Sequence, residues 1–345
     1  MPCPSLSELP PPLTGKTGWP WTQAVEPLPA GTWPKITIVT PSFNQAQFLE
    51  ETIRSVLLQG YPNLEYMVID GGSTDGSVDV IRRYAPWLAF WTSEPDRGQS
   101  DAINKGWQRA TGDVLAYLNS DDTYLPGALR WVAETFAQNP SLGLVYGRVC
   151  VIDEQSRVLR ERPVRQASLA EVLRWSPSIP QPSIFVRRTA VESVGFFNTD
   201  LHYTMDYEFS LRIGLRSEMR FIPYLLATMR DHAAAKTARD PLKHVEEGMA
   251  VAEKFFTQTL PPNLATLKQQ TLAVFCLRRA RVLSRLGRGA EARIAIHQAL
   301  RLHTDTVIIR QAATVWAMSV LGYGIIAQLR RFKRWWLQLC MGRRT

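Results

Sequence analysis

Short apolar runs alternate with stretches of helical spacing over the first 140 residues of the chain. Runs rich in β-branched and aromatic residues predict four strands, over 35–40, 64–69, 88–92 and 114–118. Apolar residues three and four positions apart predict helices between them, over 48–59, 78–84 and 100–109. Pro41 is expected to end the first strand. Successive strand–loop–helix units predict an α/β fold with a Rossmann-like, mostly parallel, doubly wound sheet.

The pattern changes after Leu144, where strands are no longer each followed by a helix. Further strands are predicted over 145–153, 157–163, 183–187 and 220–229, with helices over 188–194 and around Asp206. From about Leu242 the spacing is helical, and 280–302 has the leucine and small-residue spacing of one tetratricopeptide-like hairpin. A plain two-helix appendage is favoured, because such repeats need neighbours to bury their faces.

Composition divides the chain into four segments. Residues 1–34 are rich in proline and predict an extended arm, which Trp19, Trp21 and Trp33 are expected to pin against the domain surface. The α/β domain is expected over 35–240 and a helical appendage over 241–310. Residues 311–345 form a tail that is first apolar and then basic.

Positive charge is concentrated in the C-terminal part of the chain. The net charge is +9, but the residues from Thr271 onward carry +12 and the first 270 carry −3. A basic tail favours anionic partners, and we expect a membrane surface and no nucleic acid. Residues 311–329 are uncharged and are followed by an Arg- and Trp-rich end. An interfacial helix is favoured for this tail, and a buried C-terminal helix and a transmembrane span stay open.

Cysteine use and the N-terminus bear on location. The four cysteines are scattered without a C-x-x-C pair, so neither a disulfide framework nor a zinc site is predicted, and a reducing setting is the simplest interpretation. The N-terminus lacks the charged-then-apolar pattern of a secretion signal. We therefore expect a cytoplasmic protein, peripheral at the inner face of the membrane.

Two strand ends carry candidate chemistry. The apolar run that begins at Val114 ends in Asn119, Ser120, Asp121 and Asp122. Ligands of open α/β sheets bind at the carboxyl edge, and adjacent carboxylates are usually held together by a hard cation or by shared donors. A polar turn that caps the next helix is the competing interpretation.

The second strand ends in the glycine-rich loop 70–76, which has the pattern G-G-x-x-x-G and not the dinucleotide-binding G-x-G-x-x-G. Its opening residue, Asp70, suits a hydrogen bond to a base or ribose and not contact with phosphate. An Asx turn with a helix cap is the alternative for this loop.

Five blocks together resemble a known family. They read PSFNQAQFLEETIRSVLLQ, VIDGGSTDGS, EPDRGQSDAINKG, YLNSDD and MDYEFSLRI, in this order. They resemble the family 2 glycosyltransferases with the GT-A fold, over roughly Lys35 to Thr237. The resemblance implies inverting transfer of a hexosyl group from a nucleotide-diphosphate-sugar donor to a glycan or lipid-linked acceptor, assisted by Mg²⁺ or Mn²⁺. A non-catalytic sugar-nucleotide or polysaccharide-binding scaffold with a helical partner-binding tail is the competing hypothesis.

The resemblance also implies roles for single residues. Thr40 and Pro41 would lie beside the base, and Asp70 would bind the base or ribose. Asn119 would contact the ribose or diphosphate, although an aspartate is usual at this position of the D-x-D motif. Asp121 would hold the metal, with Asp122 able to compensate for the missing charge.

Further roles concern the reaction and the diphosphate. Asp206 matches the position of the catalytic base, with a helix cap as the plain alternative and Glu208 as the next candidate base. Arg97 and Lys105 are candidate diphosphate partners, while the spacing of Asp101 and Lys105 equally suits a helix ion pair. In a loop resembling one that closes over the diphosphate, His232 would add a metal ligand and Lys236 a phosphate contact.

Overall fold

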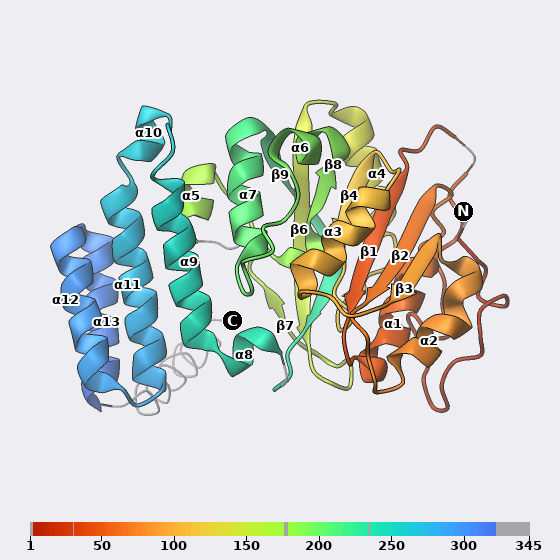
Figure 1. Cartoon of the computed structure of the whole chain (residues 1–345), viewed down its shortest axis with the longest axis horizontal. Coiled ribbons are helices and arrows are strands. Elements are labelled where there is room, and N and C mark those ends of the chain that lie inside the picture. The colour runs from red at the N-terminus through yellow and green to blue at the C-terminus, as the bar shows by residue number, and fades with distance from the viewer. Residues whose placement is uncertain (1–2, 30, 176–178, 234, 322–345) are drawn as a thin grey trace, which may run out of the picture. The chain divides into compact units, whose positions relative to one another are not determined.

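The computed structural model describes residues 3–29, 31–175, 179–233 and 235–321. Figure 1 shows the elements in chain order. The chain divides into two compact units, Met1–Ala235 and Lys236–Thr345, and each is described here by itself.

The first unit is built on one mixed, mostly parallel sheet. Its strands are β1 (Ile36–Ser42), β2 (Leu64–Asp70), β3 (Phe90–Ser93), β4 (Val114–Tyr117), β5 (Thr123–Tyr124), β6 (Leu142–Ile152), β7 (Val158–Arg162), β8 (Phe185–Arg187) and β9 (Glu218–Arg230). The order is β3-β2-β1-β4-β8-β6-β9-β5, and β7 pairs with β6. The neighbours β3, β2, β1 and β4 run parallel, so the predicted α/β class and doubly wound half are confirmed.

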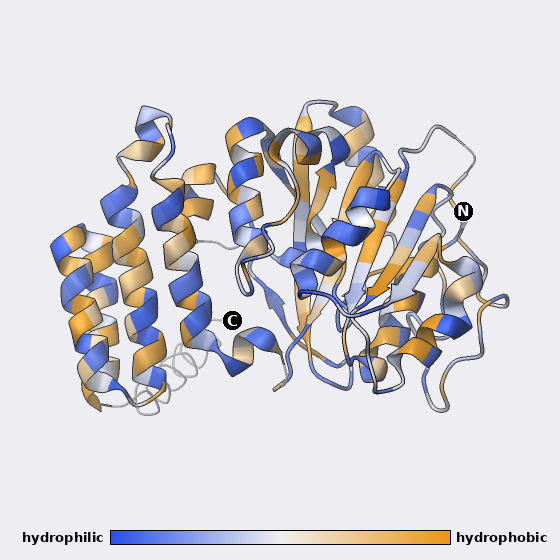
Figure 2. Ribbon diagram, in the orientation of Figure 1, coloured by the Kyte–Doolittle hydropathy of each residue, from blue (hydrophilic) through white to orange (hydrophobic). Residues whose placement is uncertain are grey.

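Helices of this unit connect and cover the strands. They are α1 (Ala46–Leu57), α2 (Ser77–Tyr84), α3 (Gln99–Arg109), α4 (Ala128–Gln138), α5 (Leu169–Leu173), α6 (Arg188–Val194) and α7 (Met205–Arg216), with short 3₁₀ turns over Ala85–Trp87 and Gln181–Ser183. The strands β1, β2 and β4 are buried along their whole length, which explains why their residues are mostly apolar. Figure 2 shows these strands mostly in apolar colours.

The first strand extends beyond its predicted end. Pro41 lies inside β1, opposite Ile69 of β2, and β1 continues to Ser42. The paired register of β1 with β4 ends at Val39, so beyond that point the strand has one ladder partner. A residue without an N–H is tolerated where a strand has an unpaired side. The extra residues bring Ser42 level with Asp70 at the edge of the sheet.

The N-terminal arm is held by a buried arginine. The Arg54 guanidinium on α1 donates to the carbonyls of Pro10, Pro20 and Trp21, at distances of 2.8–3.1 Å. Trp21 is buried, and the Trp19 indole donates to the Tyr124 carbonyl. The expected pinning by these two tryptophans is therefore present, but its main anchor is a charged residue of α1.

The second unit is helical, as predicted from Leu242 onward. It contains α8 (Lys236–Arg239), α9 (Pro241–Phe255), α10 (Pro262–Ala265), α11 (Lys268–Arg285), α12 (Gly289–Leu302) and α13 (Thr306–Leu321). Small and apolar residues of α11, α12 and α13 form one core, with α9 packed beside α11. The expected two-helix appendage is thus too small, because α9 and α13 also bury α11 and α12.

The tail is described as far as Leu321. Within α13, Ile308, Ala312, Val315 and Met318 face the helical core, while Trp316 is exposed. Across the described residues, none of the helices has the length and apolar character needed to cross a bilayer. Residues 322–345, which carry the basic end, lie outside the described residues.

Candidate active site

The loop after β4 is fixed from a neighbouring helix. The Thr52 hydroxyl of α1 lies 2.9 Å from the Ser120 carbonyl and 2.7 Å from the Asp122 carbonyl. Thr52 is fully buried, so this contact belongs to the core of the unit. The acidic loop (residues 119–122) therefore begins from a rigid base at the carboxyl end of the sheet.

The two aspartates of the acidic loop face different environments. Asp122 is only 3% exposed, and its carboxylate accepts a hydrogen bond of 2.9 Å from the Arg230 backbone N–H. Burial, and then the Asp121 charge, hold the pKa of Asp122 well above its usual range. The Asp121 side chain is 20% exposed, and its Oδ2 lies 3.0 Å from His232 Nε2. The geometry makes Asp122 an internal brace and presents Asp121 outward.

Arg230, at the end of β9, joins the acidic loop to two other segments. Its side chain is fully buried and donates to the carbonyls of Asp121 and Asp153, each at 2.8 Å. It also donates to Ser156 Oγ at 3.0 Å and to Glu51 Oε2 at 3.1 Å. One guanidinium thus bridges the acidic loop, the turn between β6 and β7, and α1. Sequence reasoning missed Arg230, although two residues further on it had found His232.

Asp121 and His232 fit a divalent cation. Two neighbouring ligands of an octahedral ion, each about 2.1 Å from it, lie about 3 Å apart, and the Asp121–His232 separation is 3.0 Å. The Asp121 hydrogen bond raises the pKa of His232, whose ring lies 5.2 Å from that of Phe48. Within the described residues there is no group of three His, Cys, Asp or Glu side chains placed for a metal. If Asp121 and His232 held the ion, donor phosphates and water could supply further ligands.

Asp206 lies in the first turn of α7. Its charge and that of Asp122 both raise the pKa of the buried Tyr117, after the effect of burial, so both carboxylates act on the same side chain of β4. Ser100 Oγ, at the start of α3, lies 2.7 Å from Met205 Sδ, which fixes this end of α7. Arg162 of β7 is half-buried, which lowers its pKa, and the Asp206 charge opposes that shift. Arg162 is a second neighbour of the site that the sequence did not reveal.

Glu208 is engaged differently. Its carboxylate makes a two-point ion pair with Arg212, at 2.8 and 2.9 Å. Arg212 also donates to the carbonyls of Val194, Gly195 and Phe196. Glu208 therefore helps to join α6 to α7, and its role as an alternative base stays a prediction.

Comparisons with known proteins place this geometry in a family. The family described as Glycosyl transferase family 2 matches residues 37–195. An uncharacterized glycosyltransferase of Mycobacterium tuberculosis (strain H37Rv) is 32% identical over 187 residues, which are 54% of this chain and 71% of the relative. The chain belongs to glycosyltransferase family 2. A PGL/p-HBAD biosynthesis glycosyltransferase of Mycobacterium bovis (strain BCG) is 29% identical over 185 residues, covering 52% of this chain and 69% of the relative.

Solved structures show the same fold at low identity. S. aureus TarS 1-349 in complex with UDP-GlcNAc has a TM-score of 0.59 and 16% identity, covering 87% of this chain and 92% of TarS. The mannosyltransferase PcManGT from Pyrobaculum calidifontis, in complex with GDP-Man and Mn²⁺, has a TM-score of 0.58 and 20% identity, and the match covers 90% of this chain and 91% of PcManGT. The GT-A fold is confirmed. The chain is a nucleotide-sugar-dependent glycosyltransferase of family 2.

The predicted base-binding residues are turned inward in this glycosyltransferase. Thr40 is buried with its hydroxyl 3.0 Å from that of Tyr66, and Pro41 is buried beside it. Asp70 is also buried, and its carboxylate accepts hydrogen bonds from Gly72 N, Ser73 N, Ser73 Oγ and Ser93 Oγ. This is the Asx turn that the sequence left open. Any role of these residues toward a base stays a prediction.

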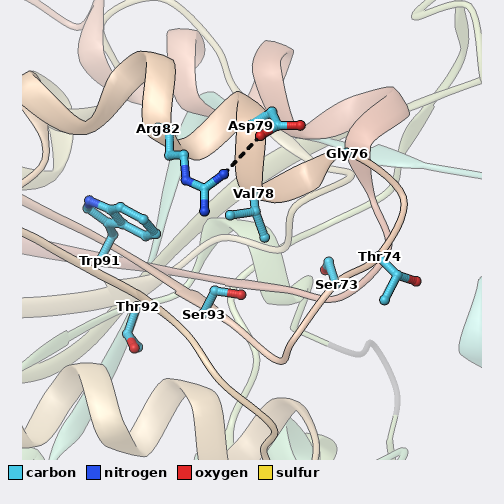
Figure 3. A pocket seen from close by; sticks show the side chains of 9 residues that line it. All are labelled: Ser73, Thr74, Gly76, Val78, Asp79, Arg82, Trp91, Thr92 and Ser93. Carbon is cyan, nitrogen blue, oxygen red and sulfur yellow. Dashed lines mark hydrogen bonds and ion pairs between the residues drawn. The ribbon is translucent and has the colours of Figure 1, made fainter.

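An open pocket of about 660 Å³ lies beside this turn, between α2 and the edge strand β3. Figure 3 shows Trp91, Thr92 and Ser93 on one side and the Asp79–Arg82 ion pair on the other. Phe43, the first residue after β1, is 60% exposed near this edge. The aromatic residue of the block PSFN follows a predicted strand end, where an apolar ring would be unusual without a ligand. Sequence reasoning did not use this signal.

The predicted diphosphate cations form ion pairs within the protein. Lys105 Nζ lies 3.1 Å from Glu94 and 3.7 Å from Asp101, and Arg97 lies 3.1 Å from Asp101. The helix ion pair therefore exists, and contact with a diphosphate stays a prediction. Lys236 opens α8 and belongs to the second unit, so its role toward the donor also stays a prediction.

Proposed function

We propose that the chain is an inverting, metal-assisted hexosyltransferase that acts on a glycan or lipid-linked acceptor. The observation that carries the proposal is the acidic loop, which presents Asp121 outward with the buried His232 ring 3.0 Å from it, while the Asp206 charge acts on Tyr117 of the strand that precedes the loop. Asp121 and His232 would hold Mg²⁺ or Mn²⁺, and the Mn²⁺ in the PcManGT complex supports this choice. The bound cation would stabilise the negative charge that grows on the leaving diphosphate.

The chain's own residues then account for the transfer. The acceptor hydroxyl oxygen attacks the anomeric carbon from the side opposite the diphosphate, and the bond from that carbon to the diphosphate oxygen breaks. Asp206 takes the hydroxyl proton as the new glycosidic bond forms. Inversion follows, because bond making and bond breaking occur on opposite faces of the sugar.

The positions of further residues suggest how the protein would bind the nucleotide part of the donor and a membrane surface. The exposed Phe43, beside the strand end at Asp70, would offer a face for a nucleobase. Thr40, Pro41 and Asp70 would shape that end of the site from beneath, and Arg97, Lys105 and Lys236 remain proposed diphosphate partners. An anionic membrane surface is a proposed partner of the basic tail.

A donor screen tests the proposal. Purified protein is incubated with UDP-, GDP- and dTDP-sugars and Mn²⁺, and release of the nucleoside diphosphate is measured with an acceptor mixture. The Asp206→Asn variant should bind the donor normally, while turnover falls by about 10²–10⁴-fold. Glu208→Gln is the matched control, and its effect should appear in stability, because Glu208 is paired with Arg212. Near-normal transfer by Asp206→Asn, with normal donor binding, would assign the proton to another residue.

A further inference from the structure

Asn119 occupies the first position of the acidic loop, and its amide faces other protein groups. Its Nδ2 lies 2.9 Å from Gln181 Oε1 and 3.5 Å from Asp122 Oδ2. Its Oδ1 accepts a hydrogen bond from Gln99 Nε2 at the start of α3. Three amides from separate segments thus form one chain, Gln99–Asn119–Gln181, which we call the amide chain.

A backbone carbonyl fixes the direction of the amide chain. Gln181 Nε2 lies 3.2 Å from the Tyr117 carbonyl oxygen, which can only accept a hydrogen bond. The amide nitrogen of Gln181 must therefore face Tyr117, and its oxygen must face residue 119. Position 119 consequently has to present a donor toward Gln181. An amide supplies that donor, and a carboxylate does not.

The neighbouring aspartate imposes the same requirement. Asp122 Oδ2 also points toward Asn119 Nδ2, so two acceptors converge on one NH₂ group. An aspartate at position 119 would place a negative oxygen against the Gln181 oxygen and against a buried carboxylate. Turning the Gln181 amide would relieve the first contact but would bring its oxygen against the Tyr117 carbonyl.

We propose that Gln181 is a positioning residue of the donor site, which enforces an amide at position 119 and so keeps that position from coordinating the cation. Asn119 then braces the acidic loop, and Asp121 remains the carboxylate of the loop that faces outward. The inference rests on the proposed function for its link to the donor. The amide chain itself is a property of the protein without any ligand.

The opposite interpretation makes a different prediction. If Asn119 merely replaces a lost metal ligand, Asn119→Asp should restore that ligand and strengthen Mn²⁺ binding. If Gln181 enforces the amide, Asn119→Asp should weaken binding of UDP or GDP with Mn²⁺ by about tenfold. That factor corresponds to one buried polar group left without its partner.

A compensating pair of variants tests the coupling. Lysine at position 181 can donate both to the Tyr117 carbonyl and to a carboxylate at 119, so Gln181→Lys should rescue Asn119→Asp. We would measure thermal unfolding without ligand, Mn²⁺ binding alone, and calorimetric affinity for UDP and GDP with Mn²⁺, on wild type, both single variants and the double variant. Gln155→Lys, at an exposed turn, is the matched control for the added charge.

The outcomes separate the amide chain from the proposed function. We expect Asn119→Asp to lower the melting temperature and nucleotide affinity, and the double variant to recover most of both. Additive effects of the two substitutions, or an Asn119→Asp protein that binds Mn²⁺ and nucleotide at least as tightly as wild type, would overturn the inference. If wild type bound neither nucleotide, the proposed function would fail, and the melting temperatures would still decide whether Gln181 and Asn119 are coupled.

Discussion

Replacing Arg230 by methionine should damage the first unit more than any exposed ion-pair substitution. Methionine has similar length and is apolar, so the substitution removes the charge without opening a large cavity. It leaves the Glu51 carboxylate without its cation, and it strands the carbonyls of Asp121 and Asp153. The Arg230 backbone N–H that binds Asp122 is unchanged by the substitution.

The magnitude follows from burial. The Arg230 side chain is fully buried and that of Glu51 is 10% exposed, so solvent screens the pair weakly. Removing one partner of a buried pair costs about 3–5 kcal/mol. Glu51 keeps a hydrogen bond of 2.8 Å from Ser156, which argues for the lower half of that range. At about 2–4 °C per kcal/mol for units of this size, the melting temperature should fall by about 6–16 °C.

Thermal and denaturant unfolding of the full chain would measure this loss, with Arg148→Met as the matched control. Arg148 makes a two-point pair with Glu161 on the same sheet, but these side chains are 37% and 42% exposed, so solvent screens the pair and we expect little change. Glu51→Gln in the Arg230→Met protein should recover part of the loss, because it removes the stranded charge. Equal effects of Arg230→Met and Arg148→Met, or no recovery by Glu51→Gln, would refute the reasoning.

Three other predictions concern the site and the tail. Asp121→Asn should abolish metal-dependent nucleotide binding with little loss of stability. Asp122→Asn should mainly lower stability, because the Asp122 carboxylate accepts the hydrogen bond from the Arg230 N–H. Calorimetry and unfolding of both variants would show the reverse if the assignment is wrong. Metal affinity should fall as pH drops through the raised pKa of His232, since a protonated imidazole cannot bind a cation. His232→Gln should flatten that dependence in a Mn²⁺ titration between about pH 5.5 and 8, a range that brackets the ordinary histidine value and reaches further above it because the pKa is raised. Truncation after Leu321, which keeps α13 and its buried residues, should abolish binding to anionic vesicles at low salt, and full-length protein that ignores such vesicles would contradict the electrostatic attraction expected of the tail.

Much of the fold was predictable because the strands are buried on both faces. The runs of β1 and β2 are mostly apolar or β-branched and that of β4 is apolar throughout, so strand length and flanking turns were sufficient to place them. The sequence predicted a strand end at Pro41 because proline lacks the N–H that a central strand needs. That lack is harmless here, because β4 does not pair with β1 beyond Val39, and the sequence alone does not show where pairing between two strands stops. The number of packed helices after Lys236 was likewise set by α9 and α13, which lie outside the hairpin-like stretch.

The candidate site was predictable only in part. The sequence places Asp121 and Asp122 together at the end of a strand, but which one is buried depends on Arg230, more than a hundred residues away. An aspartate such as Asp70 can bind a ligand, but the backbone and side chain of its own loop already donate hydrogen bonds to its carboxylate. The Gln181 contact with Asn119 joins two segments whose spacing carries no periodic signal. Local patterns identified the acidic loop, whereas long-range hydrogen bonds decide what each residue in it can do.

The charge of the acidic loop argues that donor and cation bind together. Asp121 and Glu51 oppose one buried arginine, so with both acids ionised the cluster has a formal excess of negative charge even when Asp122 is neutral. The Asp121 charge already contributes, after burial, to the raised pKa of Asp122. A diphosphate approaching this cluster alone would be repelled, whereas one divalent ion would offset the excess and attract the phosphates. A further carboxylate at position 119 would add to that excess and lie against the Gln181 oxygen. The amide of Asn119 adds no charge to the cluster, and the Gln181 oxygen gives that amide a fixed direction.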